Sequence, residues 1–344
     1  MHWPKGIPFM SPAAGFHDDI TDVPGIRVGH AENTQAATGV TVILVPEEGV
    51  PAGLQIGGSA PSTRQVDSLH AAHVVDRVHA VCFCGGSGFG LDASGGVMAY
   101  LEECGVGFRV VERTVPIVPT AAIFDLNLGN GQVRPDAHMG RQAAVSASSG
   151  PIAQGSVGAG TGATVGKLFG MTQAMKSGIG SASTISGDLI VGALVVLNAY
   201  GDVTDECGKI LAGCRSSVSA LEFADAAALL KEGKARSRRV SVENTTLSVV
   251  AVNARMDKIS ASRIAVQSTL GLGRVIRPFH SRLDGDLTIV LAVGDTDADH
   301  GRIALLAEEA LQRSLIRAIN AADGLGLLPA RRDLGLVQQS STDI

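Results

Sequence analysis

Short runs of apolar and β-branched residues recur along the chain and predict β-strands. Gly, Pro, Asn and Asp separate these runs, as turns between strands require. Several runs are continuously apolar instead of alternating between apolar and polar positions, which indicates sheets that are covered on both faces. The predicted strands span residues 39–46, 78–84, 115–126, 189–201, 246–254 and 287–295.

Segments with the apolar spacing of helices lie between the strands. In the last of them Ile303, Leu306 and Ala310 fall near one stripe, which is typical of an amphipathic helix. Buried sheets together with helices predict a layered α/β or α+β protein. The predicted helices span residues 218–233, 257–273 and 301–322.

Composition narrows the class of protein. Hydrophobic residues make up 45% of the 344 residues and charged residues 18%, which describes a core-rich chain without long disordered tails. Glycine is enriched at 43 residues, and because the glycines have no collagen period they indicate many tight turns. The net charge of −5 argues against nucleic acid or an anionic membrane as a partner.

The cysteines and the N-terminal segment predict where the protein works. Residues 1–22 hold no apolar stretch long enough for a signal peptide, and the most apolar window, from Leu189, is too short to span a bilayer. An odd number of cysteines without metal-ligand spacing indicates reduced core thiols. We therefore expect a soluble, cytoplasmic protein. The cysteines are Cys82 and Cys84, which would share one face of a strand, and Cys104, Cys207 and Cys214.

The stretch VSVENTTLSVVAVNARM, residues 240–256, raises a chemical question. A polar, basic segment at 231–244 meets a predicted strand at two adjacent threonines, Thr245 and Thr246. On its own this is typical of a solvated loop before a strand, where β-branched residues are common. The alternative is that the chain is cut between Asn244 and Thr245, because an exposed loop can accommodate a break in the backbone.

Cleavage there would make Thr245 both nucleophile and base. A free α-amine has an unperturbed pKa of roughly 7.7–8.0, so an appreciable fraction is neutral near pH 7. The amine can accept the proton of the hydroxyl on the same residue, directly or through a water. Thr246 is the competing nucleophile, but it would need a cut one bond later.

Several motifs in a common order resemble the family of self-cleaving aminopeptidases and amidases. That family includes the L-aminopeptidase/D-esterases, the β-peptidyl aminopeptidases and the nylon-oligomer hydrolase. Its peptidase members often use Ser as the nucleophile, so the Asn-Thr-Thr junction is more similar to the nylon-oligomer branch. The motifs are ITDVPGIRVGHAE from residue 20, CGGSGFGLDASGGVM from 84, GSVGAGTGATVGK at 155–167, ALVVLNAYGDV at 193–203, NTTLSVVAVNARM at 244–256 and RPFHSRLDGD at 277–286.

The resemblance implies a four-layer αββα sandwich like that of the N-terminal-nucleophile hydrolases. It also implies a single catalytic domain, 1–344, that cleaves itself into an α-part, 1–244, and a β-part, 245–344. The expected assembly is a tetramer of αβ units. The expected substrate is a small peptide or an amino amide, and no cofactor or metal is implied.

The resemblance assigns roles to several polar residues. Asn198 matches an active-site Asn and is the expected oxyanion donor, a role in which one donor contributes about 3 kcal/mol. Lys167 matches a lysine whose charge would lower the pKa of the Thr245 amine. Asp284 and Asp286 match aspartates that would orient the Thr245 hydroxyl or bind its amine. Read without the family, these residues predict a strand-end turn, a surface lysine at a helix start and an exposed Asp-Gly-Asp turn.

Two glycine-rich loops invite a nucleotide-binding interpretation. The loop at 155–167 lacks the spacing G-x4-G-K-[ST], because Leu168 follows the lysine, and the loop at 85–96 does not fit G-x-G-x-x-G. We expect the second loop to be a tight turn into a helix that lines the substrate pocket, with a purely structural turn as the alternative. Its candidate pocket residues are Gly86, Ser87 and Gly88.

Three further side chains enter the prediction. Phe124 stands where the family often has a Tyr, so a hydroxyl is missing from the expected catalytic centre, and Phe124 itself is a candidate pocket residue. His30 and His280 are expected to be structural. The two aspartates at 284 and 286 lack a His or Asp set at ligand spacing, so no metal site is predicted there.

Two other functions compete with the amide hydrolase. A self-cleaving N-acyltransferase, similar to the ornithine acetyltransferases of arginine biosynthesis, would pass the acyl group to an amine instead of water. The Thr-Met-Leu junction of those enzymes is absent here. An uncleaved, non-enzymatic binding protein is the second alternative.

Overall fold

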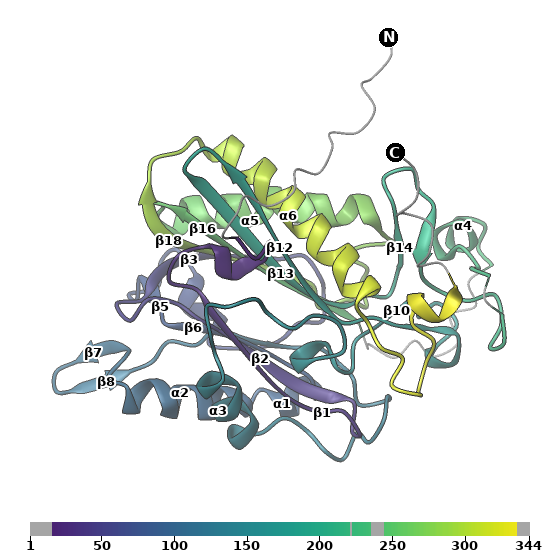
Figure 1. The fold of residues 1–344 in the computed structure, drawn as a ribbon, viewed down its shortest axis with the longest axis horizontal. Coiled ribbons are helices and arrows are strands. Elements are labelled where there is room, and N and C mark those ends of the chain that lie inside the picture. The colour runs from purple at the N-terminus through teal and green to yellow at the C-terminus, as the bar shows by residue number, and fades with distance from the viewer. Residues whose placement is uncertain (1–15, 221, 235–243, 336–344) are drawn as a thin grey trace, which may run out of the picture.

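The computed structural model describes residues 16–220, 222–234 and 244–335, and it stacks two β-sheets between layers of helices (Figure 1). The first sheet has five strands and the second has six. In spatial order the first sheet contains β1 (Arg27–Asn33), β2 (Thr38–Leu44), β6 (Ala80–Cys84), β9 (Thr120–Ala122) and β4 (Ser62–Arg64). The second contains β12 (Ile179–Ser186), β13 (Leu189–Asn198), β16 (Thr245–Ala254), β18 (Leu287–Thr296), β3 (Val50–Ile56) and β5 (Arg77–Val78).

A pair of long helices covers the outer face of each sheet. Helices α2 (Ala93–Glu103) and α3 (Ala137–Val145) pack on the first sheet, and α5 (Lys258–Val275) and α6 (His300–Asn320) pack on the second. Shorter elements are α1 (Ser87–Gly90), α4 (Ala226–Lys231), β7 (Phe108–Val110), β8 (Arg113–Val115), β10 (Thr164–Val165), β11 (Met175–Lys176), β14 (Asp202–Thr204), β15 (Ile210–Ala212) and β17 (Ile276–Arg277).

Three apolar cores hold the four layers together. Along β16, Leu247 and Val249 enter the core between the two sheets, whereas Val250 and Val252 enter the core under α5 and α6. This alternation follows from the two-residue period of a strand. Because both faces of the central strands are covered, their sequences are continuously apolar. The four-layer αββα architecture expected from the sequence is confirmed.

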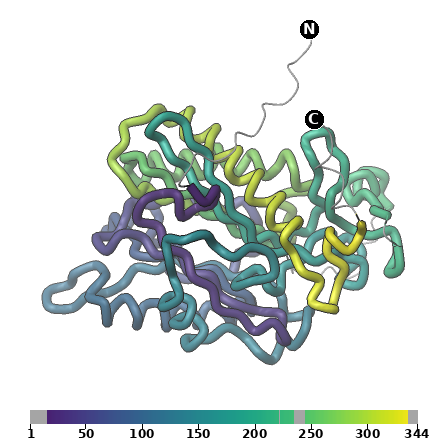
Figure 2. Tube along the Cα trace, viewed as in Figure 1, coloured from purple at the N-terminus to yellow at the C-terminus, as the bar shows by residue number. Residues whose placement is uncertain are grey.

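The chain segments on either side of residue 244 are interleaved within the second sheet. Strands β16 and β18, which follow that residue, lie between β13 and β3, which precede it. Strand β16 pairs antiparallel with β13 and parallel with β18, and β18 pairs antiparallel with β3. In Figure 2, green segments that follow residue 244 lie beside teal and purple segments that precede it.

Five of the predicted strands are confirmed, namely those at 39–46, 78–84, 189–201, 246–254 and 287–295. The prediction for 115–126 is wrong over most of its length, since Val115 ends β8 and only Thr120–Ala122, β9, forms a strand beyond it. Pro116 and Pro119 lie before β9, and a proline has no N–H to donate to a strand ladder.

Two predicted helices, at 257–273 and 301–322, are confirmed. The third, at 218–233, is wrong over its first half, because helix α4 begins at Ala226 with Asp225 as its N-cap. Before that point Ala224 N–H donates to the Cys214 carbonyl at 2.8 Å, so the backbone forms a loop instead of a helical ladder.

Helices α2 and α3 pack closely through glycines. A Cβ added to Gly96 would lie 1.7 Å from the Ala137 carbonyl oxygen, and one added to Gly140 would lie 1.9 Å from the Ala93 carbonyl oxygen. The sequence interpretation did not predict α3. The turn at 85–96 does lead into helices α1 and α2, as expected.

The five cysteines are free thiols. Cys82 and Cys84 lie on the helix-facing side of β6, as the strand alternation predicts, and Cys214 is also buried. Cys104 and Cys207 are exposed, so the expectation of core thiols is wrong for these two. Both lie outside regular strands and helices, where burial does not follow from an apolar period.

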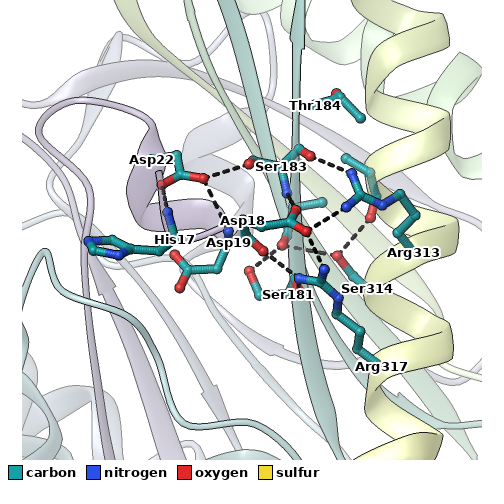
Figure 3. A network of polar contacts seen from close by, with 12 residues as sticks. His17, Asp18, Asp19, Asp22, Ser181, Ser183, Thr184, Arg313, Ser314 and Arg317 are labelled. Atoms are coloured by element: carbon teal, nitrogen blue, oxygen red, sulfur yellow. Dashed lines mark hydrogen bonds and ion pairs between the residues drawn. The ribbon is translucent and has the colours of Figure 1, made fainter. Parts of the chain in front are cut away.

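An N-terminal segment is bound to the edge of the second sheet by a polar network (Figure 3). Asp18 accepts hydrogen bonds from Arg313 (2.6 Å) and Arg317 on α6 and from the Ser183 backbone amide (3.2 Å) on β12. The Ile20 amide donates to Ser181 Oγ at 2.8 Å. The segment therefore covers the edge strand β12 and joins it to α6.

Candidate active site

Two central strands place Thr245 and Asn198 side by side. Asn198 ends β13, Thr245 begins β16, and the two residues are directly opposite each other in the antiparallel register. Directly opposed residues share a face of the sheet. That face is the one between the sheets, because Val196 and Leu247, two residues away on each strand, lie in the core between the sheets.

The alternation of β16 separates the two adjacent threonines. Thr246 has the parity of Val250, so its side chain faces the helix layer and not the face that Asn198 shares. Its Oγ1 is buried without a hydrogen-bond partner. Its backbone amide donates to Asp286 Oδ1 at 2.6 Å. Of the two hydroxyls, only that of Thr245 therefore faces the polar residues between the sheets.

The bond between Asn244 and Thr245 is buried, with both residues 3% exposed. Thr245 Oγ1 lies 2.5 Å from the carbonyl oxygen of Asn244. The same oxygen accepts a hydrogen bond of 2.8 Å from the Gly285 amide. The expected exposed loop before the junction falls largely at 235–243, outside the described residues, but the junction itself is not exposed.

The Asn198 side chain has an amide orientation that its neighbours determine. Oδ1 accepts from Lys167 Nζ at 2.7 Å and from the Thr164 backbone amide at 3.1 Å. Nδ2 donates to the Phe124 carbonyl at 3.1 Å. Two donors on one side and a carbonyl on the other allow a single orientation of the amide.

Lys167 is buried at 7% exposure and also donates to the Asn198 carbonyl at 3.1 Å. It is followed by a turn, so the simple interpretation as a surface lysine at a helix start is wrong. The Gly170 amide closes this turn by donating to the Lys167 carbonyl at 3.0 Å, and the short strand β10 lies just before the lysine.

Asp284 and Asp286 are buried at 2% and 1% exposure, so the simple interpretation as an exposed turn is also wrong. Asp284 accepts from the backbone amides of Ser281 (2.9 Å) and Tyr200 (3.2 Å). Tyr200 lies two residues beyond Asn198, so Asp284 joins the segment 284–286 to the end of β13. Burial raises the pKa of Asp284 to about 6, and the charge of Asp286 is the second cause of this increase.

The candidate pocket residues lie just beyond two strands of the first sheet, with Gly86, Ser87 and Gly88 after β6 and Phe124 after β9. Phe124 is half-buried and contacts Asn198 through its carbonyl, not through its ring. Ser87 adopts φ 54° and donates its amide to the Ile123 carbonyl at 2.9 Å. Gly86 is buried, and Gly88 is exposed. The turn at Gly86 and Ser87 is therefore joined to the segment that contacts Asn198, and Gly88 points to the surface.

The sequence interpretation missed three groups that contact the candidate active-site residues. The Gly285 amide is a backbone donor, and a sequence shows no signal for it beyond a glycine between two aspartates. Thr164 likewise contributes its backbone amide to Asn198. His280 was expected to be structural, yet its ring Nδ1 lies 3.0 Å from Asp286 Oδ2. The spacing of six residues to Asp286 carried no recognisable motif. His30 is half-buried, and the loss of solvent around its ring lowers its pKa to about 4.

Within residues 16–220, 222–234 and 244–335, no group of three or more His, Cys, Asp or Glu is arranged to hold a metal ion. Over the same residues no helix is long and apolar enough to cross a membrane.

Comparison with known proteins agrees with this geometry. The model of peptidase family S58 matches residues 18–324. The chain is 35% identical to an uncharacterized aminopeptidase of Mycobacterium leprae, over 91% of this chain and 92% of that protein. It is 30% identical to a 6-aminohexanoate-oligomer endohydrolase of Paenarthrobacter ureafaciens, over 80% and 75%.

The fold is similar to that of the L-aminopeptidase D-Ala-esterase/amidase from Ochrobactrum anthropi, which is described as a variant of the Ntn-hydrolase fold. The TM-score is 0.69 at 19% identity, over 95% of this chain and 94% of that one. The fold and the family together define a hydrolase that acts on peptide or amide bonds. The chain belongs to peptidase family S58.

Proposed function

We propose that the chain cleaves itself between Asn244 and Thr245 and then hydrolyses amides with Thr245 as an N-terminal nucleophile. The observation that carries the proposal is the contact of the Thr245 hydroxyl with the carbonyl group of Asn244, in which Oγ1 lies 2.5 Å from the carbonyl oxygen, at a junction that is buried. A separate protease has no access to a bond with 3% exposure. The hydroxyl on the next residue, in contrast, is already in contact.

The Gly285 amide supports the cleavage step. Thr245 Oγ1 attacks the Asn244 carbonyl carbon, the C–N bond breaks, and the hydroxyl proton passes to the Thr245 nitrogen. Negative charge develops on the carbonyl oxygen, which already accepts a hydrogen bond from Gly285. Water then hydrolyses the ester, which gives an Asn244 carboxylate and a free α-amine on Thr245.

In turnover, the free amine takes the proton of the Thr245 hydroxyl as the hydroxyl attacks the acyl carbon of the substrate. Asn198 lies on the same face of the sheet as Thr245, and we assign it the role of hydrogen-bond donor to the oxyanion that forms on the substrate. The positive charge of Lys167 lowers the pKa of the amine, while Asp284 and Asp286 bind it or orient the hydroxyl. Water releases the acyl group from Thr245.

The substrate class is a small peptide or an amino amide. Relatives of this chain include proteins named aminopeptidase and proteins named 6-aminohexanoate-oligomer endohydrolase. We assign N-terminal aminoacyl amides and β- or ω-amino amides to this chain as substrates. The reason for the second class is that the Asn-Thr-Thr junction resembles that of the nylon-oligomer branch. The same resemblance assigns a tetramer of αβ units with one catalytic domain per chain, and the free thiols favour a cytoplasmic location.

A substrate panel tests the proposal. Purified protein is incubated with aminoacyl amides and with 6-aminohexanoate oligomers, with and without an added amine acceptor, and the products are identified by mass spectrometry. We expect free acids in both conditions. Acyl-amine products would instead define a transferase. Thr246→Val is the matched control, because the Thr246 hydroxyl has no partner and faces the helix layer, so this variant retains activity.

A further inference from the structure

A buried aspartate lies directly beside the segment that contacts Asn198. Asp125 is 5% exposed and follows Phe124, whose carbonyl accepts from Asn198 Nδ2. Its Oδ1 accepts from the Gly86 amide at 2.7 Å, and its Oδ2 accepts from Thr38 Oγ1 at 2.7 Å. These bonds fix the Phe124–Asp125 backbone to the turn after β6 and to the start of β2.

The glycine-rich motifs leave the space that this carboxylate occupies. A Cβ on Gly85 would lie 1.9 Å from Asp125 Oδ2, and a Cβ on Gly162 would lie 2.4 Å from Asp125 Cβ. Neither distance is compatible with a side chain. The loops at 85–96 and 155–167, which lack nucleotide-binding spacing, therefore enclose a buried carboxylate.

A buried lysine lies behind the other contact of Asn198. Lys176 is 0% exposed, and its Nζ donates to the carbonyls of Ser177 (2.6 Å), Ala163 (3.0 Å) and Gly160 (3.3 Å). Ala163 directly precedes Thr164, whose amide donates to Asn198 Oδ1. Lys176 thus fixes the loop that presents this amide.

We propose that Asp125 and Lys176 are positioning residues that orient the Asn198 amide from its two sides. Asp125 fixes the carbonyl that Nδ2 contacts, and Lys176 fixes the amide that Oδ1 contacts. The charge of each side chain favours the ionised form of the other, but the two do not bond to each other directly. Each instead ends in hydrogen bonds to the loops around Asn198. This inference rests on the proposed function, because Asn198 acts there on the substrate.

A double-mutant cycle on the cleaved enzyme tests the proposal. We expect Asp125→Ala and Lys176→Met each to lower kcat about 10- to 100-fold with little change in KM, because they displace a group that acts in the transition state. In the background of Asn198→Ala, each should lower kcat less than threefold further, because a positioning residue has no effect once its target is absent. Full, multiplicative losses in that background would overturn the proposal.

Conservative and distant variants complete the design. Asp125→Asn keeps an acceptor for Gly86 and a partner for Thr38, so it should restore kcat to within about threefold of the unaltered enzyme. If Asp125→Ala does not fold, Thr38→Val replaces it in the same double-mutant cycle with Asn198→Ala. Asp19→Ala removes another buried aspartate, in the N-terminal segment, and should not couple to Asn198. Absence of activity in the unaltered protein contradicts the proposed function instead.

Discussion

The carboxyl group of Asp284 lies beside the Asn244–Thr245 junction and accepts hydrogen bonds from two backbone amides. Burial raises its pKa to about 6, so it carries a negative charge only above that pH. The proposed role, which is to bind the Thr245 amine or orient its hydroxyl, needs the charged form. We therefore expect kcat/KM to fall as the pH decreases through about 6, measured as a pH–rate profile on an aminoacyl amide.

Asp284→Asn should remove this acidic limb and lower the plateau of kcat/KM. Burial also raises the pKa of Asp125 and of Asp202 to about 6. The Thr245 amine, as the proposed base, also loses activity when it is protonated. An acidic limb near pH 6 that persists unchanged in Asp284→Asn would therefore belong to one of those two carboxyls or to this amine, and would contradict the assignment to Asp284.

The sequence predicted which side chains meet at the junction better than it predicted how they are held. Thr245, Asn198 and Lys167 are distant in the chain and were placed together by resemblance, and the structure brings them into contact or onto one face. The Gly285 amide was missed because a backbone donor leaves no trace in residue identity. Asp125 and Lys176 were missed because a buried and an exposed charge look the same in a sequence.

At the scale of an element, the segment 284–286, which begins at the bridge between Asp284 and Asn244, connects the junction to β18. Its central Gly285 donates to the Asn244 carbonyl, and a Cβ there would lie 2.6 Å from the Ala60 carbonyl oxygen and 2.8 Å from Thr245 Oγ1. Gly285→Ala must therefore displace the amide. We expect self-cleavage to slow about 100-fold, the effect of losing one oxyanion donor, measured as accumulation of uncleaved chain on a gel.

Gly150→Ala is the matched control for that variant. A Cβ on Gly150 would meet nothing closer than Ser148 Oγ at 3.7 Å, so cleavage should be normal. Normal cleavage in Gly285→Ala as well would show that the Gly285 amide does not stabilise the cleavage step.

Elements with a strong period were predicted well, and irregular ones were not. The continuously apolar strands β13, β16 and β18 and the amphipathic helix α6 are set by burial, which the sequence records directly. The described residues at 216–220 and 222–225 form a loop with backbone hydrogen bonds, such as that from the Ala224 amide to the Cys214 carbonyl, although their sequence has a helical period. Helix α3 depends on glycine contacts that periodicity does not show.

At the scale of the whole molecule, the interleaving of β16 and β18 between β13 and β3 decides what cleavage would do. Both segments that a cut at 244 would produce share one sheet and two apolar cores. The two chains would therefore remain one folded unit, since separating them would expose the central strands to water. The family resemblance predicted the four-layer arrangement, whereas the continuously apolar strands predicted only that the sheets are covered by other layers.

Intact-mass spectrometry of purified, active protein beside its Thr245→Ala variant tests the central claim most directly. The account predicts two chains in the active protein, 1–244 and 245–344, with a free amine on Thr245. It predicts a single chain of 35.2 kDa, without amidase activity, in the variant. Active protein in which residues 244 and 245 remain joined, or a variant that splits normally, would contradict it.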